Sequence, residues 1–188
     1  MKLYLLRHGE TDFNAKGLLQ GWIDEPLNPA GIAVAQATRD GLKQAGITFD
    51  RIYSSTLKRA IETATIICGE SVPLMLDARL RELSFGSYEG LCYPNLTCPI
   101  PCPGGECLEE LEERVRAFLG DFFQRGTIEG ETVLISTHGM TIRAILKIFG
   151  CYPTILDVPP HGNCGISILQ VDGFEHRVSL VQENVLFY

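Results

Sequence analysis

The sequence predicts an α/β fold, a three-layer α/β/α sandwich with a mostly parallel sheet and an antiparallel hairpin at its edge. Short apolar runs that indicate strands alternate along the chain with segments of helical periodicity. The last two such runs flank a single Asp-Gly pair, which is typical of a hairpin. The chain has 188 residues, 45% of them hydrophobic, with no internal repeat and no convincing linker. We therefore expect a single domain over residues 1–188.

Four short runs are the expected parallel strands. They cover residues 2–6, 49–54, 73–76 and 132–136. Continuous apolar runs such as the first are typical of strands that are buried on both faces of a sheet. The closing hairpin is expected at residues 165–171 and 176–182. Its exposed edge can pair with a second chain, which leaves a homodimer open.

Four helices are expected between these strands. The first follows Asn28, which can cap it, and Pro29, which suits its first turn, and it stops at Gly46. The others are expected at residues 56–68, at 108–122 with one apolar face, and after residue 139 as far as residue 149. Residues 91–103 hold four prolines and three cysteines, so we expect them to be irregular.

The charge of the chain limits its partners and its compartment. The 16 Lys and Arg against 23 Asp and Glu give a net charge of −7, which argues against nucleic acid and anionic membranes as partners. An anionic substrate would therefore need a local basic pocket. No run is long enough for a membrane helix, and the first residues do not form a signal peptide. With an odd number of cysteines, seven, we expect a cytoplasmic enzyme.

Polar side chains follow three of the predicted strands, at the point where each strand ends. Because ligands of open α/β sheets bind beyond the carboxyl ends of the strands, these side chains would meet if the three strands were neighbours. They are Arg7, His8, Arg59 and His138. If the strands were not neighbours, the same four residues would be unrelated surface side chains.

Two local features favour an anion at this place. Arg59 falls in the first turn of its predicted helix, where the helix dipole disfavours a cation and a bound anion would offset the cost. His138 and Gly139 directly precede another helix, whose first backbone N–H groups are free to hold phosphate oxygens. Gly9 and Gly139 each allow close backbone approach beside a histidine.

These residues also carry a resemblance to a known family. The segment Leu6-Arg7-His8-Gly9-Glu10-Thr11, with Asn14 behind it, resembles the N-terminal Arg-His-Gly (RHG) signature of the histidine phosphatase superfamily, which includes the cofactor-dependent phosphoglycerate mutases. The match continues in order and spacing through four further blocks: residues 54–60, residues 81–83 together with Gly86 and 89–90, residues 103–106, and residues 136–139. Together the five blocks cover nearly the whole chain, and as a set they are highly specific.

The resemblance implies a metal-independent reaction without a cofactor. It implies that His8 attacks phosphorus through one ring nitrogen while a backbone hydrogen bond fixes the other. Arg7, Arg59 and His138 would bind the phosphoryl oxygens, so that the arginines neutralise the charge that a metal ion would otherwise neutralise. Glu82 would protonate the leaving oxygen and then deprotonate the attacking water.

The same family pattern implies further binding residues. Thr11, Asn14, Gln20 and Gly21 would line the phosphate and substrate mouth, and Gly139 would present its backbone to phosphate. Purely structural roles also fit three of these residues when the family pattern is set aside. Thr11 can be a helix cap, Asn14 a turn residue and Glu82 a solvated loop acid. His161 can border the pocket and His176 can lie exposed in the hairpin, and neither has an assigned role.

Departures from the mutase pattern favour hydrolysis of a small phosphomonoester. Met140 and Phe85 stand where that pattern favours Asn and Tyr, and residues 91–103 contain no Lys or Arg to hold a second phosphate. Losing several charge-assisted contacts weighs against a bisphosphorylated substrate. The alternatives are a cofactor-dependent phosphoglycerate mutase and a catalytically silent phosphate-binding module on the same fold.

Four cysteines crowd into residues 92–107, and they allow three interpretations. They are Cys92, Cys98, Cys102 and Cys107. Free thiols are the preferred interpretation, followed by a conditional disulfide. A zinc clip is the third, because Cys98 and Cys102 have a spacing found in structural zinc sites although a paired CxxC motif is absent.

Overall fold

The computed structural model describes residues 1–69, 72–92, 100–126, 128–172 and 177–188, and their centre is a six-stranded sheet. The strands in chain order are β1 (Lys2–Arg7), β2 (Arg51–Ser54), β3 (Leu74–Leu76), β4 (Thr132–Thr137), β5 (Ile166–Val171) and β6 (Val178–Val185). Across the sheet the order is β3-β2-β4-β1-β5-β6. The first four strands are mutually parallel, whereas β5 runs antiparallel to β1 and β6 antiparallel to β5. The predicted α/β class, mostly parallel sheet and edge hairpin are confirmed.

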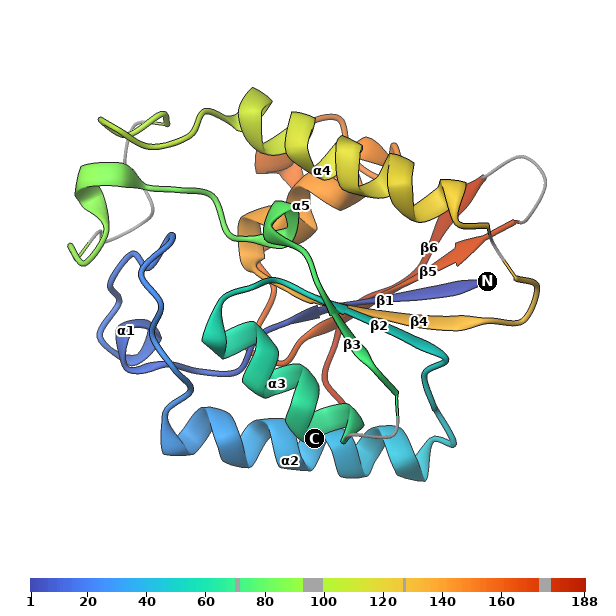
Figure 1. The fold of residues 1–188 in the computed structure, drawn as a ribbon. Coiled ribbons are helices and arrows are strands. Elements are labelled where there is room, and N and C mark those ends of the chain that lie inside the picture. Colours follow the sequence, from blue (N-terminus) through green and yellow to red (C-terminus); the bar gives the residue numbers. More distant parts are fainter. Residues whose placement is uncertain (70–71, 93–99, 127, 173–176) are drawn as a thin grey trace.

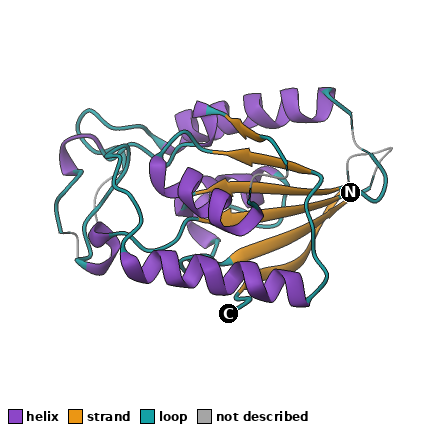
Figure 2. Ribbon diagram, turned by 60° about the horizontal axis from the view of Figure 1, so that its bottom comes forward, coloured by secondary structure: helices purple, strands orange, loops and turns teal. Residues whose placement is uncertain are grey.

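Helices cover both faces of this sheet (Figures 1 and 2). On one face lie α2 (Pro29–Gln44) and α3 (Lys58–Cys68), and on the other lie α4 (Leu108–Gln124) and α5 (Gly139–Ile148). Side chains of β1 alternate between the two cores: Leu3 and Leu5 pack on the α4 and α5 side, and Leu6 packs on the α2 and α3 side. The continuous apolar run at the start of the chain is thus explained by a strand that is buried on both faces.

Local signals set most helix boundaries as expected. Asn28 accepts a hydrogen bond from the Gly31 N–H at 2.8 Å and so caps α2, with Pro29 in its first turn. The helix expected to begin at residue 56 begins at Lys58 instead. The hydroxyl of Ser55 accepts from the Leu57 N–H, and that of Thr56 accepts from Arg81, so this stretch is held as a loop.

Some elements differ from the expected ones in length. A short helix, α1 (Asp12–Ala15), follows β1 and had no counterpart among the expected helices. The outer strand β6 starts and ends later than the expected 176–182, because its pairing with β5 continues across a register shift as far as Val185. Residues 173–176, including His176, lie outside the described part of the chain.

The sheet places the ends of three neighbouring strands together. Within the central parallel strands, Arg7 of β1 is level with Thr137 of β4, and Ser54 of β2 is level with Ser136 of β4. The segments that follow these three strands therefore leave the sheet at one edge. In the described residues no helix is long and apolar enough to cross a bilayer.

Candidate active site

The strand ends bring two histidines and a buried arginine into contact. The rings of His8 and His138 lie 5.2 Å apart between centroids. Arg59 approaches from the first turn of α3 and donates from Nε to His138 Nδ1 at 3.2 Å. His8 is 2% exposed, and the other two are fully buried. Residues from three distant segments of the chain, Arg7 and His8, Arg59, and His138, thus lie close together, as the strand-end argument expected.

The ring of His8 is fixed with one nitrogen free. Its Nδ1 lies 2.7 Å from the carbonyl oxygen of Gly9, and because a carbonyl only accepts, Nδ1 carries the proton. Nε2 then holds the lone pair. Burial, followed by the positive charges of Arg59 and Arg7, holds the pKa of His8 well below its usual value. The imidazole is therefore neutral and oriented, which is the state that a nucleophile needs.

Arg59 and His138 form a rigid pair behind His8. The Arg59 guanidinium donates from Nη1 to the Ile23 carbonyl and from Nη2 to the Gly21 carbonyl, both at 2.8 Å. His138 accepts from Arg59 on Nδ1, so its Nε2 carries the proton and donates to Ser55 Oγ at 2.8 Å. Burial lowers the pKa of Arg59 to about 10 and that of His138 well below its usual value.

Arg7 presents an unused donor to the same space. It donates from Nη1 to the His161 carbonyl, while its buried Nε has no hydrogen-bond partner among the described residues. Burial lowers the pKa of Arg7, and the carboxylate of Glu82 opposes this shift. A buried N–H without a partner is costly, and an anion in the pocket would satisfy it.

Glu82 is held at the start of α5 by backbone groups. Its Oε1 accepts from the Leu83 N–H at 2.9 Å and from the Met140 N–H at 3.0 Å. A side chain on Gly139 would begin 3.7 Å from Glu82 Oε2 and 4.0 Å from Arg7 Nε, so Gly139 keeps the space between these two groups open. The carboxyl group thus faces the pocket and is fixed in direction.

A pocket of about 290 Å³ contains these groups. Its lining includes the predicted site residues Arg7, His8, Asn14, Gln20, Gly21, Arg59, Glu82 and Gly139. Two predicted site residues are absent from the lining. His138 lies behind Arg59, and Thr11 caps α1 and donates to Gln20 Oε1 at 3.0 Å. The capping alternative for Thr11 is thus what the structure has, and Thr11 reaches the pocket only through its neighbours.

The sequence left several lining residues without a role. Arg143 lies four residues after Gly139 on α5, one helical turn away, and that spacing could have placed it on the same face. His161 borders the pocket, as the sequence allowed, and Met140 follows Gly139 on α5. The others come from segments outside the long helices and strands and were harder to foresee: Leu18, Leu19, Phe85, Ile100, Leu156 and Pro160.

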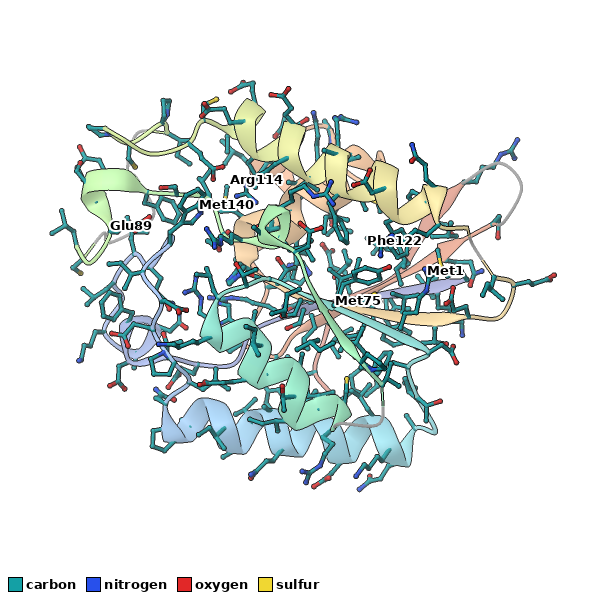
Figure 3. All side chains as sticks on the ribbon, in the orientation of Figure 1. Met1, Met75, Glu89, Arg114, Phe122 and Met140 are labelled. Carbon is teal, nitrogen blue, oxygen red and sulfur yellow. The ribbon has the colours of Figure 1, made fainter. Side chains whose placement is uncertain are left out.

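Arg114, an arginine that does not line the pocket, holds the loop that carries Glu82. Arg114 of α4 donates to the backbone carbonyls of Arg79, Arg81 and Glu82 at 2.7–2.9 Å. It also pairs with Glu106, with two contacts of 2.8 and 2.9 Å. Figure 3 shows Arg114, Met140 and Glu89 toward one end of the molecule and Met1 and Phe122 toward the other. By holding the backbone of this loop, Arg114 fixes the direction in which the Glu82 side chain leaves it.

The cysteine cluster is only partly described. Cys92 and Cys107 are free thiols, Cys102 is buried, and Cys107 caps α4. Cys98 lies outside the described residues, so the choice among thiol, disulfide and zinc stays a prediction for the cluster as a whole. Within the described residues there is no group of three or more His, Cys, Asp or Glu side chains placed to hold a metal ion.

Comparisons with known proteins agree with this geometry. A protein of Hydrogenobacter thermophilus named "Putative phosphoserine phosphatase 2" is 38% identical over 161 residues, which is 77% of this chain and 76% of that protein. A 2,3-bisphosphoglycerate-dependent phosphoglycerate mutase of Beijerinckia indica is 32% identical over 78% of this chain and 79% of its own. A solved mycobacterial glucosyl-3-phosphoglycerate phosphatase in complex with VO3 has a TM-score of 0.85, with 27% identity over 98% of this chain and 99% of that one.

The family model of the histidine phosphatase superfamily (branch 1) covers almost the whole chain, from residue 3 to residue 184. The match includes every motif on which the resemblance was based. The predictions of the superfamily and of a phosphatase within it are confirmed. The protein belongs to the histidine phosphatase superfamily (branch 1).

Proposed function

We propose that the protein hydrolyses a small phosphomonoester through a phosphohistidine on His8. One observation carries the proposal: the ring of His8 is neutral, fixed at Nδ1 by Gly9 and free at Nε2, inside a pocket whose charged lining is mainly arginine. A phosphate binder has no need of an oriented lone pair. A nucleophile needs this arrangement.

In the first half-reaction, Nε2 of His8 attacks phosphorus and the bond to the ester oxygen breaks. Protonated Glu82 gives its proton to the departing oxygen, so that an alcohol leaves. In the second half-reaction, the Glu82 carboxylate takes a proton from water, and the resulting hydroxide attacks phosphorus. The bond to Nε2 breaks, inorganic phosphate leaves, and both His8 and Glu82 return to their starting states.

The positive side chains stabilise the charge that develops on the phosphoryl oxygens. The guanidinium of Arg59 is already pinned by two carbonyls and by His138, so it needs no reorganisation when charge develops. Arg7 adds its buried Nε, which has no hydrogen-bond partner among the described residues. His138 acts here through Arg59, whose direction it fixes, because its own ring is fully buried behind that side chain.

A phosphoglycerate mutase is the second candidate, supported by the 32% identical mutase of Beijerinckia indica. It would share the first half-reaction and return the phosphoryl group to another acceptor. The absence of Lys and Arg from residues 91–103 supports hydrolysis instead, because a bisphosphorylated substrate would lack charge partners there. The odd number of cysteines supports the cytoplasm as the place of action.

The test compares the wild type with His8→Ala on p-nitrophenyl phosphate across mildly acidic to neutral pH. We expect His8→Ala to fold and to lose nearly all turnover, because His8 follows β1 and its ring lies in the pocket. Arg39→Ala, on the exposed face of α2, is the matched control and should keep full activity. Substantial turnover by His8→Ala would contradict the nucleophile role, and an inactive wild type would favour the silent binding module.

The reaction products distinguish a phosphoglycerate mutase from a hydrolase. The wild type receives 3-phosphoglycerate together with 2,3-bisphosphoglycerate. Free phosphate is the product expected from hydrolysis, whereas 2-phosphoglycerate formed without net phosphate release would favour the mutase.

A further inference from the structure

Trp22 is an exposed aromatic residue that is held by three contacts. Its indole Nε1 donates to the backbone carbonyl of Glu82 at 2.8 Å, and its backbone N–H donates to Glu89 Oε1 at 2.9 Å. The guanidinium of Arg81 lies 5.4 Å from the centre of the indole ring. Trp22 is 42% exposed and does not line the pocket. Burial in a core therefore does not explain these contacts, all of which are made to residues 81–89.

The residues on either side of Trp22 hold an arginine of the pocket. The carbonyl oxygens of Gly21 and Ile23 each accept from the Arg59 guanidinium at 2.8 Å. Trp22, between them, donates to the Glu82 carbonyl instead. The tripeptide Gly21–Ile23 thus connects two groups of the proposed mechanism that come from different parts of the chain, Arg59 from α3 and Glu82 from the loop between β3 and α4.

Glu89 fixes the backbone of this tripeptide. Its Oε1 accepts from the Phe85 N–H at 3.0 Å as well as from the Trp22 N–H. Gly21 has a φ of +49°, and a Cβ there would collide with Glu89 Oε1, so any other residue would displace that carboxylate. The two segments lie side by side at one end of the molecule (Figure 1). The backbone of Trp22 is therefore held against the same loop whose carbonyl its indole binds.

The Glu82 carbonyl oxygen has two donors from different parts of the fold. Arg114 of α4 donates from Nη2 at 2.9 Å, and Trp22 donates from Nε1 at 2.8 Å. The N–H of the same peptide group, that of Leu83, donates to Glu82 Oε1 at 2.9 Å. A tilt of this peptide group would therefore move the carboxyl group with it. Two donors restrict such a tilt more than one does.

We propose that Trp22 is a positioning residue for Glu82, acting through the peptide group between Glu82 and Leu83. Because the same tripeptide holds Arg59, Trp22 sets where the carboxyl group stands relative to the bound phosphoryl group. The inference rests on the proposed function, in which Glu82 protonates the departing oxygen. A proton donor must come within about 2.6–3.2 Å of the oxygen that it protonates, so a small displacement slows this step.

The test compares two esters that need the acid to different degrees. Phenol is a poorer leaving group than p-nitrophenol, so phenyl phosphate depends more on a proton from Glu82. Trp22→Phe removes the indole N–H and keeps an aromatic ring beside Arg81. We expect kcat/KM to fall about three- to tenfold on phenyl phosphate and by less than about twofold on p-nitrophenyl phosphate. Because kcat/KM covers the steps up to alcohol release, the later attack of water does not enter this comparison.

A double-variant cycle shows whether the effect passes through Glu82. Glu82→Gln removes the proton and should slow phenyl phosphate more than p-nitrophenyl phosphate. Adding Trp22→Phe to Glu82→Gln should cause no further loss on phenyl phosphate, because the group that Trp22 positions no longer acts. Losses that multiply in the double variant would mean that Trp22 acts elsewhere, and they would overturn the inference.

Controls separate positioning from general damage. Inorganic phosphate should inhibit Trp22→Phe as strongly as the wild type, because Gly21 and Ile23 hold Arg59 through backbone carbonyls that the substitution leaves in place. Weaker inhibition, or an equal loss on both esters, would mean that the whole loop has shifted, and either result would overturn the inference. Arg39→Ala, on the exposed face of α2, should leave both esters unchanged.

The outcomes distinguish the inference from the proposed function. Turnover that is lost in His8→Ala but unchanged in Trp22→Phe would overturn the role of Trp22 and leave the hydrolase in place. An equal fall in kcat/KM on both esters in Glu82→Gln would remove the acid role of Glu82, and the inference with it, while His8 remained the nucleophile. No turnover of either ester by the wild type would overturn both the hydrolase and the inference.

Discussion

The two ends of the central sheet use arginine in opposite ways. At the end where β2 begins, Arg51 forms a two-pronged pair with Glu131, with one contact at 2.6 Å, and lies 5.2 Å from the centre of the Phe122 ring. At the end where the strands finish, Arg7, Arg59 and Arg143 have no carboxylate within ion-pair distance among the described residues. Figure 3 places Phe122 and Met140 at these opposite ends.

The pKa directions express the same difference. The hydrogen bonds and charge of Glu131 outweigh burial and raise the pKa of Arg51. At the other end burial dominates and lowers the pKa of Arg7, Arg59 and Arg143. Arg51 stabilises the folded chain through its pair with Glu131, whereas Arg7, Arg59 and Arg143 are held at a cost that an anionic ligand would relieve. We therefore expect Arg51 to serve stability and the arginines of the pocket to serve binding.

Among the arginines of the two ends, the largest expected effect is the loss of transition-state stabilisation in Arg59→Met. We expect kcat for p-nitrophenyl phosphate to fall about a hundred- to a thousandfold, as when one preorganised donor is removed from an oxyanion site. Steady-state kinetics check this, with Arg39→Ala as the control. A change confined to KM would mean that Arg59 binds the substrate and the transition state equally.

The next prediction concerns the free energy of unfolding, to which the arginines at the two ends of the sheet should contribute differently. Arg51→Met leaves Glu131 buried without its partner, so we expect the free energy of unfolding to fall by about 3 kcal/mol. Arg143→Met removes a cation that forms no ion pair within the described part of the chain, and it should change this free energy by less than about 0.5 kcal/mol. Urea unfolding without phosphate measures both. Equal losses would break the distinction between the two ends.

Features that are encoded by neighbouring residues could be predicted from the sequence, whereas features that depend on contacts between distant residues could not. The buried strand β1 and the cap of α2 are encoded by adjacent residues, so their positions were predicted closely. The shared edge of the strands also followed, since parallel neighbours finish together. The spacing of Arg143 from Gly139 could have placed it on the pocket side of α5, but the other lining residues, such as Leu156 and Pro160, are distant in sequence, so no role for Arg143 was predicted.

Arg114 was missed for a related reason. In sequence it is one of several charged residues on an amphipathic helix, and only the folded loop shows that its donors meet three backbone carbonyls. The start of α3 was predicted two residues early because the contacts that hold Thr56 in a loop include Arg81, which is distant in sequence. Tertiary contacts of this kind carry no local signature.

A smaller effect is expected in the pH dependence of the free energy of unfolding, and it tests whether the histidines of the site are neutral in the folded protein. Burial lowers the pKa of His8 and of His138 below that of an unfolded histidine, about 6.5. Below that pH the unfolded chain binds protons that the folded chain excludes, so stability is lost as the pH falls. Each such histidine contributes a slope of about 1.4 kcal/mol per pH unit.

His8→Asn cannot titrate and should show a slope that is shallower by about this amount between pH 6.5 and 5. Unfolding curves at several pH values measure the slope. An unchanged slope would indicate that His8 is protonated in the folded protein, which would remove the lone pair that the mechanism needs.

The central claim is that His8 carries the phosphoryl group, and trapping that group tests it most directly. Glu82→Gln treated with p-nitrophenyl phosphate should form the intermediate, because this leaving group needs little help from an acid, and should hydrolyse it slowly because the base is gone. After an alkaline quench, peptide mass spectrometry should find one added phosphoryl group on His8. A phosphoryl group on another side chain, or turnover with none on His8 at any time, would contradict the account.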